Sequence, residues 1–359
     1  MSRRATDGTC LETLVRMAIP LCQAAQCQCQ CPRTGPGRKP EFEDWKMAVL
    51  IMVAILNRRK SKSAQYRWVS EHRVEVLRWL PLQRLPARST FFDRYRRVHR
   101  LYQAAIELQG RQTIRERVAD PTTVAVDKSL IAARGPRWHR SDRKANRIPK
   151  GLHGVDRDST WAFSKHHGWV QGYGYEVVVT AGKGSTVFPL LASVDTASLS
   201  EHVSFAAKVD HLPPRTKHVL ADSGYDNDRF GERIEWTENQ RRTGRRFLCP
   251  RNPRAVPTRK LPNVGAAGLS TRRRHRLQRL AFYKSRAGRR LYRRRGQSVE
   301  PFNEWFKSIF ELDGHVWHRG LDNNRTQILA AIFCYQLLLR YNHRHRNHNG
   351  QIQWILDRL

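Results

Sequence analysis

Acidic residues are scarce in this chain, and between Asn239 and Val299 they are missing altogether. That stretch of 61 residues holds 20 Lys or Arg, and the acid that ends it is Glu300. Over all 359 residues, 66 Lys and Arg face 31 Asp and Glu, which gives a net charge of +35. So large and widespread a surplus predicts a polyanionic partner, and nucleic acid is the first candidate.

Long hydrophobic runs are missing as well. No stretch of about 18 uncharged apolar residues occurs, which argues against a transmembrane helix. Near the N-terminus, Asp7, Glu12 and Arg16 interrupt the apolar region that a secretory signal needs. We therefore expect an intracellular protein with no membrane partner, in the cytoplasm and associated with the nucleoid.

Cysteine is rare beyond the first 31 residues, which hold Cys10, Cys22, Cys27, Cys29 and Cys31. Their spacing matches none of the CxxC pairs that hold zinc, and the first histidine is His72. We interpret residues 1–40 as a flexible lead segment rich in Cys and Gln, with a metal site as the alternative. The two later cysteines, Cys249 and Cys334, lie in apolar surroundings and are expected in the core.

Residues 41–118 are expected to form a small all-helical DNA-binding region. Residues 41–57 predict a buried helix with acids in its first turn, where the helix dipole favours them. A second helix is expected to start with Ser89 as its N-cap. Five apolar residues of this helix share one face: Phe91, Tyr95, Val98, Tyr102 and Ala105. Arg96, Arg97 and Arg100 point elsewhere, either into a DNA groove or into solvent.

From Thr122 the pattern changes to the alternation of strands. Strands are predicted over 122–132, 169–180, 185–195, 217–222 and 245–249, and helices over 199–209, 227–236, 299–312 and 325–342. This order predicts an α/β domain over 119–342, with a mixed five-stranded sheet flanked by helices.

Two basic segments interrupt or follow this domain. Residues 251–290 have too few apolar side chains to fold alone, so we expect a connector that lies along phosphate backbone. Residues 343–359 are expected to be a basic tail, whose His343, His345 and His348 are solvated, contact DNA or bind metal. Trp236 either stacks on an extruded base or packs against the sheet.

Three acids stand beside apolar segments. Asp127 ends TTVAVD, Asp222 ends KHVLAD, and Glu300 opens a helix in which Lys307 follows two turns later on the same face. Carboxylates that meet at one edge of a sheet can hold two Mg²⁺ ions and cleave a phosphodiester. Each acid alone is also explained as a turn or cap residue. Rival positions are Asp226, Asp228 and Glu304.

Three motifs carry a resemblance to a known family. VAVDKSL, VLADSGYDN and YRRRGQSVEPFNEWFK together resemble the DDE transposases of bacterial insertion sequences, which have a ribonuclease H-like catalytic domain. One branch of that family has a Tyr, Arg, Glu, Lys signature. Here Tyr292, Arg295, Glu300 and Lys307 are separated by two, four and six residues. The middle gap is one residue longer than in the family pattern, which leaves the arginine open between Arg294 and Arg295.

The resemblance implies a metal-dependent enzyme. In that family the two Asp and the Glu bind Mg²⁺ or Mn²⁺, so Asp127, Asp222 and Glu300 would hold the ions. Tyr292, Arg295 or Arg294, and Lys307 would contact DNA. The implied partners are double-stranded DNA, as terminal inverted repeats and as target, and further copies of the chain.

One residue departs from the family pattern. Lys128 stands after the first Asp, where small or hydroxyl residues are common, and its ammonium is expected to compete with metal for Asp127. This motivates an alternative function, that of a DNA-binding protein descended from a transposase that no longer cuts. A basic RNA-binding scaffold is a third interpretation.

Overall fold

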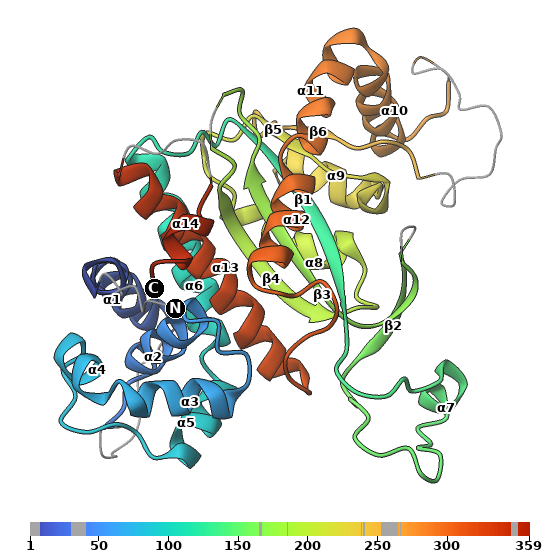
Figure 1. Cartoon of the computed structure of the whole chain (residues 1–359). Coiled ribbons are helices and arrows are strands. Elements are labelled where there is room, and N and C mark those ends of the chain that lie inside the picture. The colour runs from blue at the N-terminus through green and yellow to red at the C-terminus, as the bar shows by residue number, and fades with distance from the viewer. Residues whose placement is uncertain are drawn as a thin grey trace.

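The computed structural model describes residues 8–29, 41–164, 167–184, 186–237, 239, 241–252, 265, 267–345 and 351–359. A twisted sheet crosses the centre of the molecule, with helices packed around it (Figure 1). Within these residues, no helix combines the length and the apolar character that crossing a bilayer requires.

Six strands form the sheet in the described part of the chain. They are β1 (Thr123–Ala132), β2 (Thr160–Ser164), β3 (Gly168–Thr180), β4 (Pro189–Thr196), β5 (His218–Leu220) and β6 (Arg246–Leu248). Strand β3 pairs antiparallel with β1, and also with β2 and β4. Strands β5 and β6 continue the sheet from β1 in parallel. The prediction of five strands was wrong because it missed β2. This five-residue strand pairs with the first residues of β3.

Six helices precede the sheet: α1 (Gly8–Cys29), α2 (Asp44–Leu56), α3 (Lys62–Glu71), α4 (Arg73–Trp79), α5 (Arg88–Tyr95) and α6 (His99–Arg115). The prediction of a flexible lead segment was wrong for residues 8–29. Leu14, Ala18, Leu21, Cys22 and Ala25 are buried at helical spacing, where α1 packs against α2 and α6. Residues 1–7 and 30–40, including Cys31, lie outside the described residues.

The helix predicted from Ser89 onward is two helices. Helix α5 starts at Arg88 with Ala87 at its N-cap position, and a turn at residues 96–98 separates it from α6. All five apolar residues of the predicted face are nevertheless buried. A bend that keeps the apolar side chains inward satisfies the same pattern as a straight helix.

Helices that pack on the sheet include α8 (Glu201–Ala206), α9 (Asp228–Glu235), α12 (Val299–Ile309) and α13 (Leu321–Arg344). Helices α6 and α13 both contact β4, and α13 also contacts α2. The buried Gln336 amide donates to Ile106 O at 3.0 Å and to Pro189 O at 2.8 Å, so it ties α13 to both α6 and β4. The N-terminal helices and the sheet therefore share one core.

The basic connector predicted over 251–290 is helical where the structure describes it from residue 271 onward. Helices α10 (Thr271–Lys284) and α11 (Arg286–Gly296) meet at Ser285, which caps α11 through Gly288 N at 3.0 Å. Leu277 and Leu280 are buried, and arginines of α10 pair with acids around α9. Ion pairs thus replace part of the apolar contact that the segment lacks. Residues 253–264 and 266 lie outside the described residues.

The C-terminal segment is partly packed rather than a free tail. Helix α13 runs on to Arg344, and α14 (Gln353–Leu356) buries Ile355 and Leu356. The Trp354 indole donates to Asn342 Oδ1 at 3.0 Å. Residues 346–350, among them His348, lie outside the described residues. The remaining short elements are α7 (Arg140–Lys144), η1 (Val209–His211) and η2 (Ser223–Tyr225).

Candidate active site

Asp127 and Lys128 point to opposite faces of the sheet, because side chains alternate along β1. On one face, Asp127 accepts hydrogen bonds from Asn303 Nδ2 of α12 at 2.8 Å and from Arg295 Nη2 of α11 at 2.6 Å. On the other, Lys128 Nζ donates to Ala197 O at 2.8 Å and also to Leu199 O. Lys128 thus makes its hydrogen bonds away from Asp127, and its charge acts on Glu201 of α8.

Arg295 joins Asp127 to Glu300. Its second terminal nitrogen lies 3.1 Å from Glu300 Oε1, so one guanidinium contacts both carboxylates. The side chains of Arg295 and Asp127 are 11% and 17% exposed, whereas that of Glu300 is 62% exposed. Arg295, rather than Arg294, is thus the arginine that faces these acids.

Asp222 follows β5, the parallel neighbour of β1. Its Oδ1 accepts from Gly224 N at 2.8 Å and caps η2. Burial raises the pKa of Asp127 to about 6; Arg295 acts to lower it, and the charges of Asp222 and Glu300 raise it further. Asp222 and Glu300 are therefore both close enough to Asp127 to disfavour its charged form. The rivals Asp226 and Asp228 instead pair with Arg276 of α10, at 2.6 and 3.1 Å.

A fourth acid, Glu201, belongs to this group and was not predicted. It is the first residue of α8, where an acid is an ordinary helix start. Burial raises the pKa of Glu201 to about 8, and the charges of Asp222 and Asp127 add to this effect. Its carboxylate fills the space beside Gly224, where a Cβ would overlap Glu201 Oε2. Only the folding of α8 onto η2 and β3 reveals this position.

The acids do not form a metal site as they stand. Among the described residues, no group of three His, Cys, Asp or Glu side chains is placed to hold a metal ion. A guanidinium lies instead between Asp127 and Glu300. The donor set is still chemically suited to Mg²⁺ or Mn²⁺, because both prefer oxygen ligands from carboxylates. The N-terminal cysteines give no site either within the described part, where Cys10 and Cys22 are buried.

Two of the other predicted DNA contacts, Tyr292 and Lys307, are partly buried. Tyr292 is partly buried and packs edge-to-face on Tyr283 at 5.0 Å, and burial raises its pKa above the ordinary value. Lys307 Nζ donates to Leu130 O at 3.2 Å, on the same strand as Asp127. Burial lowers the pKa of Lys307.

Three predicted contacts lie away from the acids. Arg96, Arg97 and Arg100 are exposed where α5 meets α6, and Arg96 pairs with Asp93 at 3.2 Å. Helices α5 and α11 lie at opposite ends of the molecule (Figure 1). The structure therefore does not bring these arginines together with Asp127.

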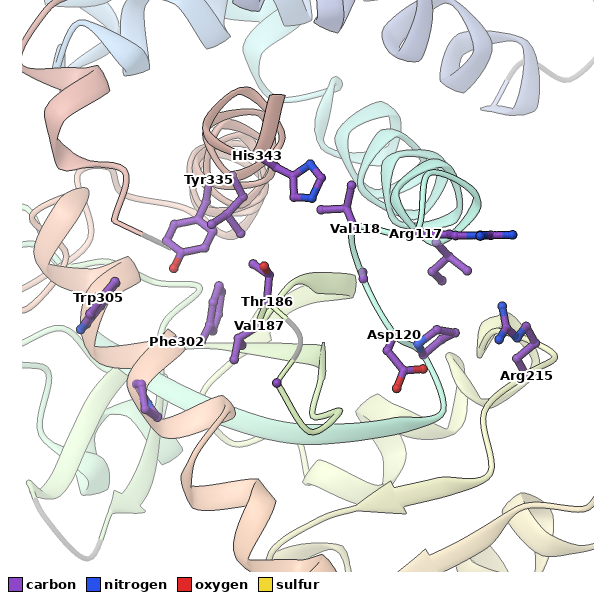
Figure 2. Close-up of a pocket in the computed structure, with 16 residues that line it drawn as sticks. Arg117, Val118, Asp120, Thr186, Val187, Arg215, Phe302, Trp305, Tyr335 and His343 are labelled. Carbon is purple, nitrogen blue, oxygen red and sulfur yellow. The ribbon is translucent and has the colours of Figure 1, made fainter. Parts of the chain in front are cut away.

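Trp236 neither packs on the sheet nor offers a free ring face. It lines a pocket of about 440 Å³, where His275 stacks on it at 4.4 Å and the Arg242 guanidinium lies 5.0 Å from its ring centre. His343 is elsewhere, at the end of α13, where it lines the larger cavity shown in Figure 2.

A larger cavity lies beside the acids rather than on them. It measures about 830 Å³ and lies between the end of α6, α12, α13 and the turn before β4. In Figure 2, Phe302 and Tyr335 stand on one side, and Arg117 and Arg215 on the other. Its wall includes Pro301, the residue after Glu300, but no member of the acid group.

Comparison with known proteins gives a family match. A family model described as a transposase DDE domain matches residues 118–337. No curated protein matches the chain. Among solved structures, the chain is similar to the piggyBac transposase in a cryo-EM structure of its synaptic complex with hairpin DNA. The two are 11% identical over 99% of this chain and 79% of the other, with a TM-score of 0.41.

Proposed function

Because this chain belongs to the transposase DDE-domain family, we propose that it cuts DNA at the ends of a mobile element and joins those ends to target DNA. The proposed reaction hydrolyses one phosphodiester to expose a 3′-hydroxyl. That hydroxyl then attacks a phosphodiester of the target, so no covalent protein intermediate is needed. The observation that carries this proposal is the convergence of Asp127, Asp222 and Glu300 around Arg295.

The sheet supports a ribonuclease H-like interpretation of the domain. Strands β4, β3 and β1 are antiparallel neighbours, and β5 and β6 extend them in parallel. This places Asp127 on the central strand and Asp222 just beyond the adjacent one, at the same level of the sheet. Asp127 and Asp222, which are far apart in sequence, thereby lie at the same level of neighbouring strands.

The proposed cofactor is Mg²⁺ or Mn²⁺, held by Asp127, Asp222 and Glu300. When bound, such ions activate water and offset charge on the phosphate. Asn303 holds the Asp127 carboxylate in place through Oδ2. Arg295 keeps the acids neutralised in the metal-free protein and is free to bind a phosphate oxygen once it is released.

The finer parts of the proposal follow the family resemblance. We place the chain with bacterial insertion sequences and the branch that carries the Tyr, Arg, Glu, Lys signature. Tyr292, Arg295 and Lys307 would contact DNA near the cleaved phosphate. The protein would act on terminal inverted repeats as an oligomer in the bacterial cytoplasm.

A second candidate is a transposase-derived protein that binds DNA without cutting. It is favoured by one observation: within the described residues, an arginine rather than an arrangement of three metal ligands occupies the acid group. This candidate predicts intact DNA binding and no nicking with any divalent metal.

The test is cleavage of the DNA that flanks the coding region, with Mg²⁺ or Mn²⁺, by the wild type and by Asp127→Asn and Glu300→Gln. We expect cleavage by the wild type alone. Wild-type rates in either variant would refute the assignment of these acids. Binding by all three proteins with no nicking would favour the second candidate.

A further inference from the structure

Several basic side chains beyond the acid group make no ion pair with a described acid. Arg117 and Arg215 flank the cavity in Figure 2, and Lys217, Arg242 and Arg246 line the pocket beside Trp236. All five are exposed, and none makes an ion pair with a described acid. On α10, by contrast, Arg272 pairs with Glu232 and Arg276 pairs with Asp226.

The two pockets adjoin at the segment that leads into β5. Arg215 lines the larger cavity, and Lys217, two residues further along the chain, lines the smaller pocket. Arg246 lines the same pocket from β6, where it pairs with His218 of β5. The charge of Arg294 on α11 acts on Asp120 together with that of Arg215, and on His218 together with those of Arg246 and Lys217, which agrees with a position near both pockets. The cations therefore form a band from one pocket to the other.

Two acids along this band, Asp120 and Glu235, make hydrogen bonds or ion pairs with other groups. Asp120 accepts from Thr122 Oγ1 at 2.6 Å and from Thr122 N at 3.0 Å. Glu235 accepts from Phe247 N at 2.9 Å and pairs with Arg279 at 3.5 Å. The charges of Arg215 and Arg294 act on Asp120 and that of Arg246 acts on Glu235, but neither carboxylate forms an ion pair with these cations in the described part of the chain.

The smaller pocket is preorganised for phosphate rather than for a base. The Arg246 guanidinium lies 4.1 Å from the ring centre of Phe282, and Arg242 stacks on Trp236. A guanidinium held over an aromatic ring is restrained in position, and its N–H groups can still donate to phosphate oxygens. Trp236 is already covered by Arg242 and His275, which leaves little room for a base to stack.

We propose that Arg117, Arg215, Arg294, Lys217, Arg242 and Arg246 form a cationic track that binds the phosphodiester backbone of duplex DNA. The track extends the site to a DNA segment beyond the one at the acid group. It rests on the proposed function, because that function supplies DNA as the partner.

The experiment measures binding without divalent metal, so cleavage plays no part. A labelled duplex of about 30 base pairs, roughly three helical turns, is titrated by fluorescence anisotropy over a range of salt concentrations. Two double variants test the two ends of the track: Arg117→Ala with Arg215→Ala, and Arg242→Ala with Arg246→Ala. The matched control is Arg137→Ala with Arg157→Ala, two exposed arginines near α7 that also lack ion pairs.

Each track variant is expected to weaken binding by about tenfold at low salt, and to lower the slope of log affinity against log salt by about two. The control variant should change the affinity at low salt and the slope with salt by only a small fraction of these amounts. Equal losses in the control would mean that affinity follows net charge alone, and would overturn the track. Unchanged slopes in both track variants would also overturn it.

The outcome is separable from the cleavage test. If the track variants lose affinity as expected while Asp127→Asn cleaves like the wild type, the track stands and only the proposed active site fails. A wild-type protein that does not bind the duplex would overturn both.

Discussion

Arg295 Nη2 lies 2.6 Å from Asp127 Oδ1, and this contact places a fixed positive charge where the proposed function requires a metal ion. The other terminal nitrogen of Arg295 holds Glu300 at 3.1 Å. A guanidinium and a divalent cation would compete for the same oxygens. The metal-free protein thus carries its own counter-charge in the acid group.

The first prediction concerns Arg295→Ala. Without metal, the buried Asp127 would keep only the Asn303 donor, so we expect the variant to lose about 1–3 kcal/mol of unfolding free energy. Millimolar Mg²⁺ should then raise its thermal midpoint more than that of the wild type, because no guanidinium competes. The measurement is thermal unfolding with EDTA and with Mg²⁺.

Arg294→Ala is the control for this prediction. Arg294 is the neighbouring arginine and makes no ion pair with a described acid. Its removal should leave the response to Mg²⁺ like that of the wild type. Equal Mg²⁺ shifts in Arg295→Ala and Arg294→Ala would show that Arg295 does not compete with the metal.

The second prediction concerns Glu201, whose carboxylate lies beside Gly224 and near Asp222. With a pKa raised to about 8, Glu201 is mostly protonated at neutral pH in the metal-free protein, and a bound cation would favour its charged form. Glutamine cannot acquire that charge, so the substitution should weaken cation binding. Glu201→Gln is expected to lower the apparent affinity for Mg²⁺, measured from the thermal shift, by roughly tenfold to a hundredfold. The cleavage rate is expected to fall by a similar factor. That range is typical for groups that support metal ligands.

Glu304→Gln provides the matched control, since Glu304 is an exposed acid on α12 beyond the group. It should behave like the wild type in both measurements. A Glu201→Gln protein indistinguishable from Glu304→Gln would remove Glu201 from the site.

Much of the sheet was predictable because its signal is local. The alternation of β1 and β3 and the apolar ends before Asp127 and Asp222 are written in consecutive residues. Helix α12, with Glu300 in its first turn, follows from the same kind of pattern. The sequence also predicted the position of Arg295 to within one residue.

What the sequence did not predict depends on contacts between distant residues. Helix α10 looks too polar to fold, and it is held by acids in or just before α9, some 40 to 50 residues earlier, as in the Arg272–Glu232 and Arg276–Asp226 pairs. Glu201 looks like any acid at a helix start until α8 folds against η2. Local periodicity carries no information on either contact.

The last prediction concerns His318, which is 6% exposed and lies on the segment between α12 and α13. Its Nε2 lies 3.1 Å from the Tyr95 hydroxyl, and the two rings meet edge-on with centroids 5.2 Å apart. Burial lowers the pKa of His318 from 6.5 to about 3, and the charges of Lys62 and Arg134 act in the same direction. The folded protein therefore holds this imidazole neutral.

The sign of the effect follows from linkage. Between pH 6.5 and about 3 the unfolded chain binds a proton at His318 that the folded protein does not, so stability falls as pH falls through this window. Each unit of pH below 6.5 costs about 1.4 kcal/mol, or about 2 kcal/mol at about pH 5. Above pH 6.5 the contribution is complete and constant.

His318→Gln keeps a polar partner for Tyr95 and removes the titration. We expect the wild type to exceed this variant in unfolding free energy above pH 7, and the difference to shrink by about 2 kcal/mol at about pH 5. Urea unfolding at the two pH values measures it. His315→Gln is the control, because His315 is an exposed histidine on the same segment and its removal leaves the buried imidazole in place. If His318→Gln and His315→Gln differed from the wild type with the same dependence on pH, the buried imidazole would not link folding to pH.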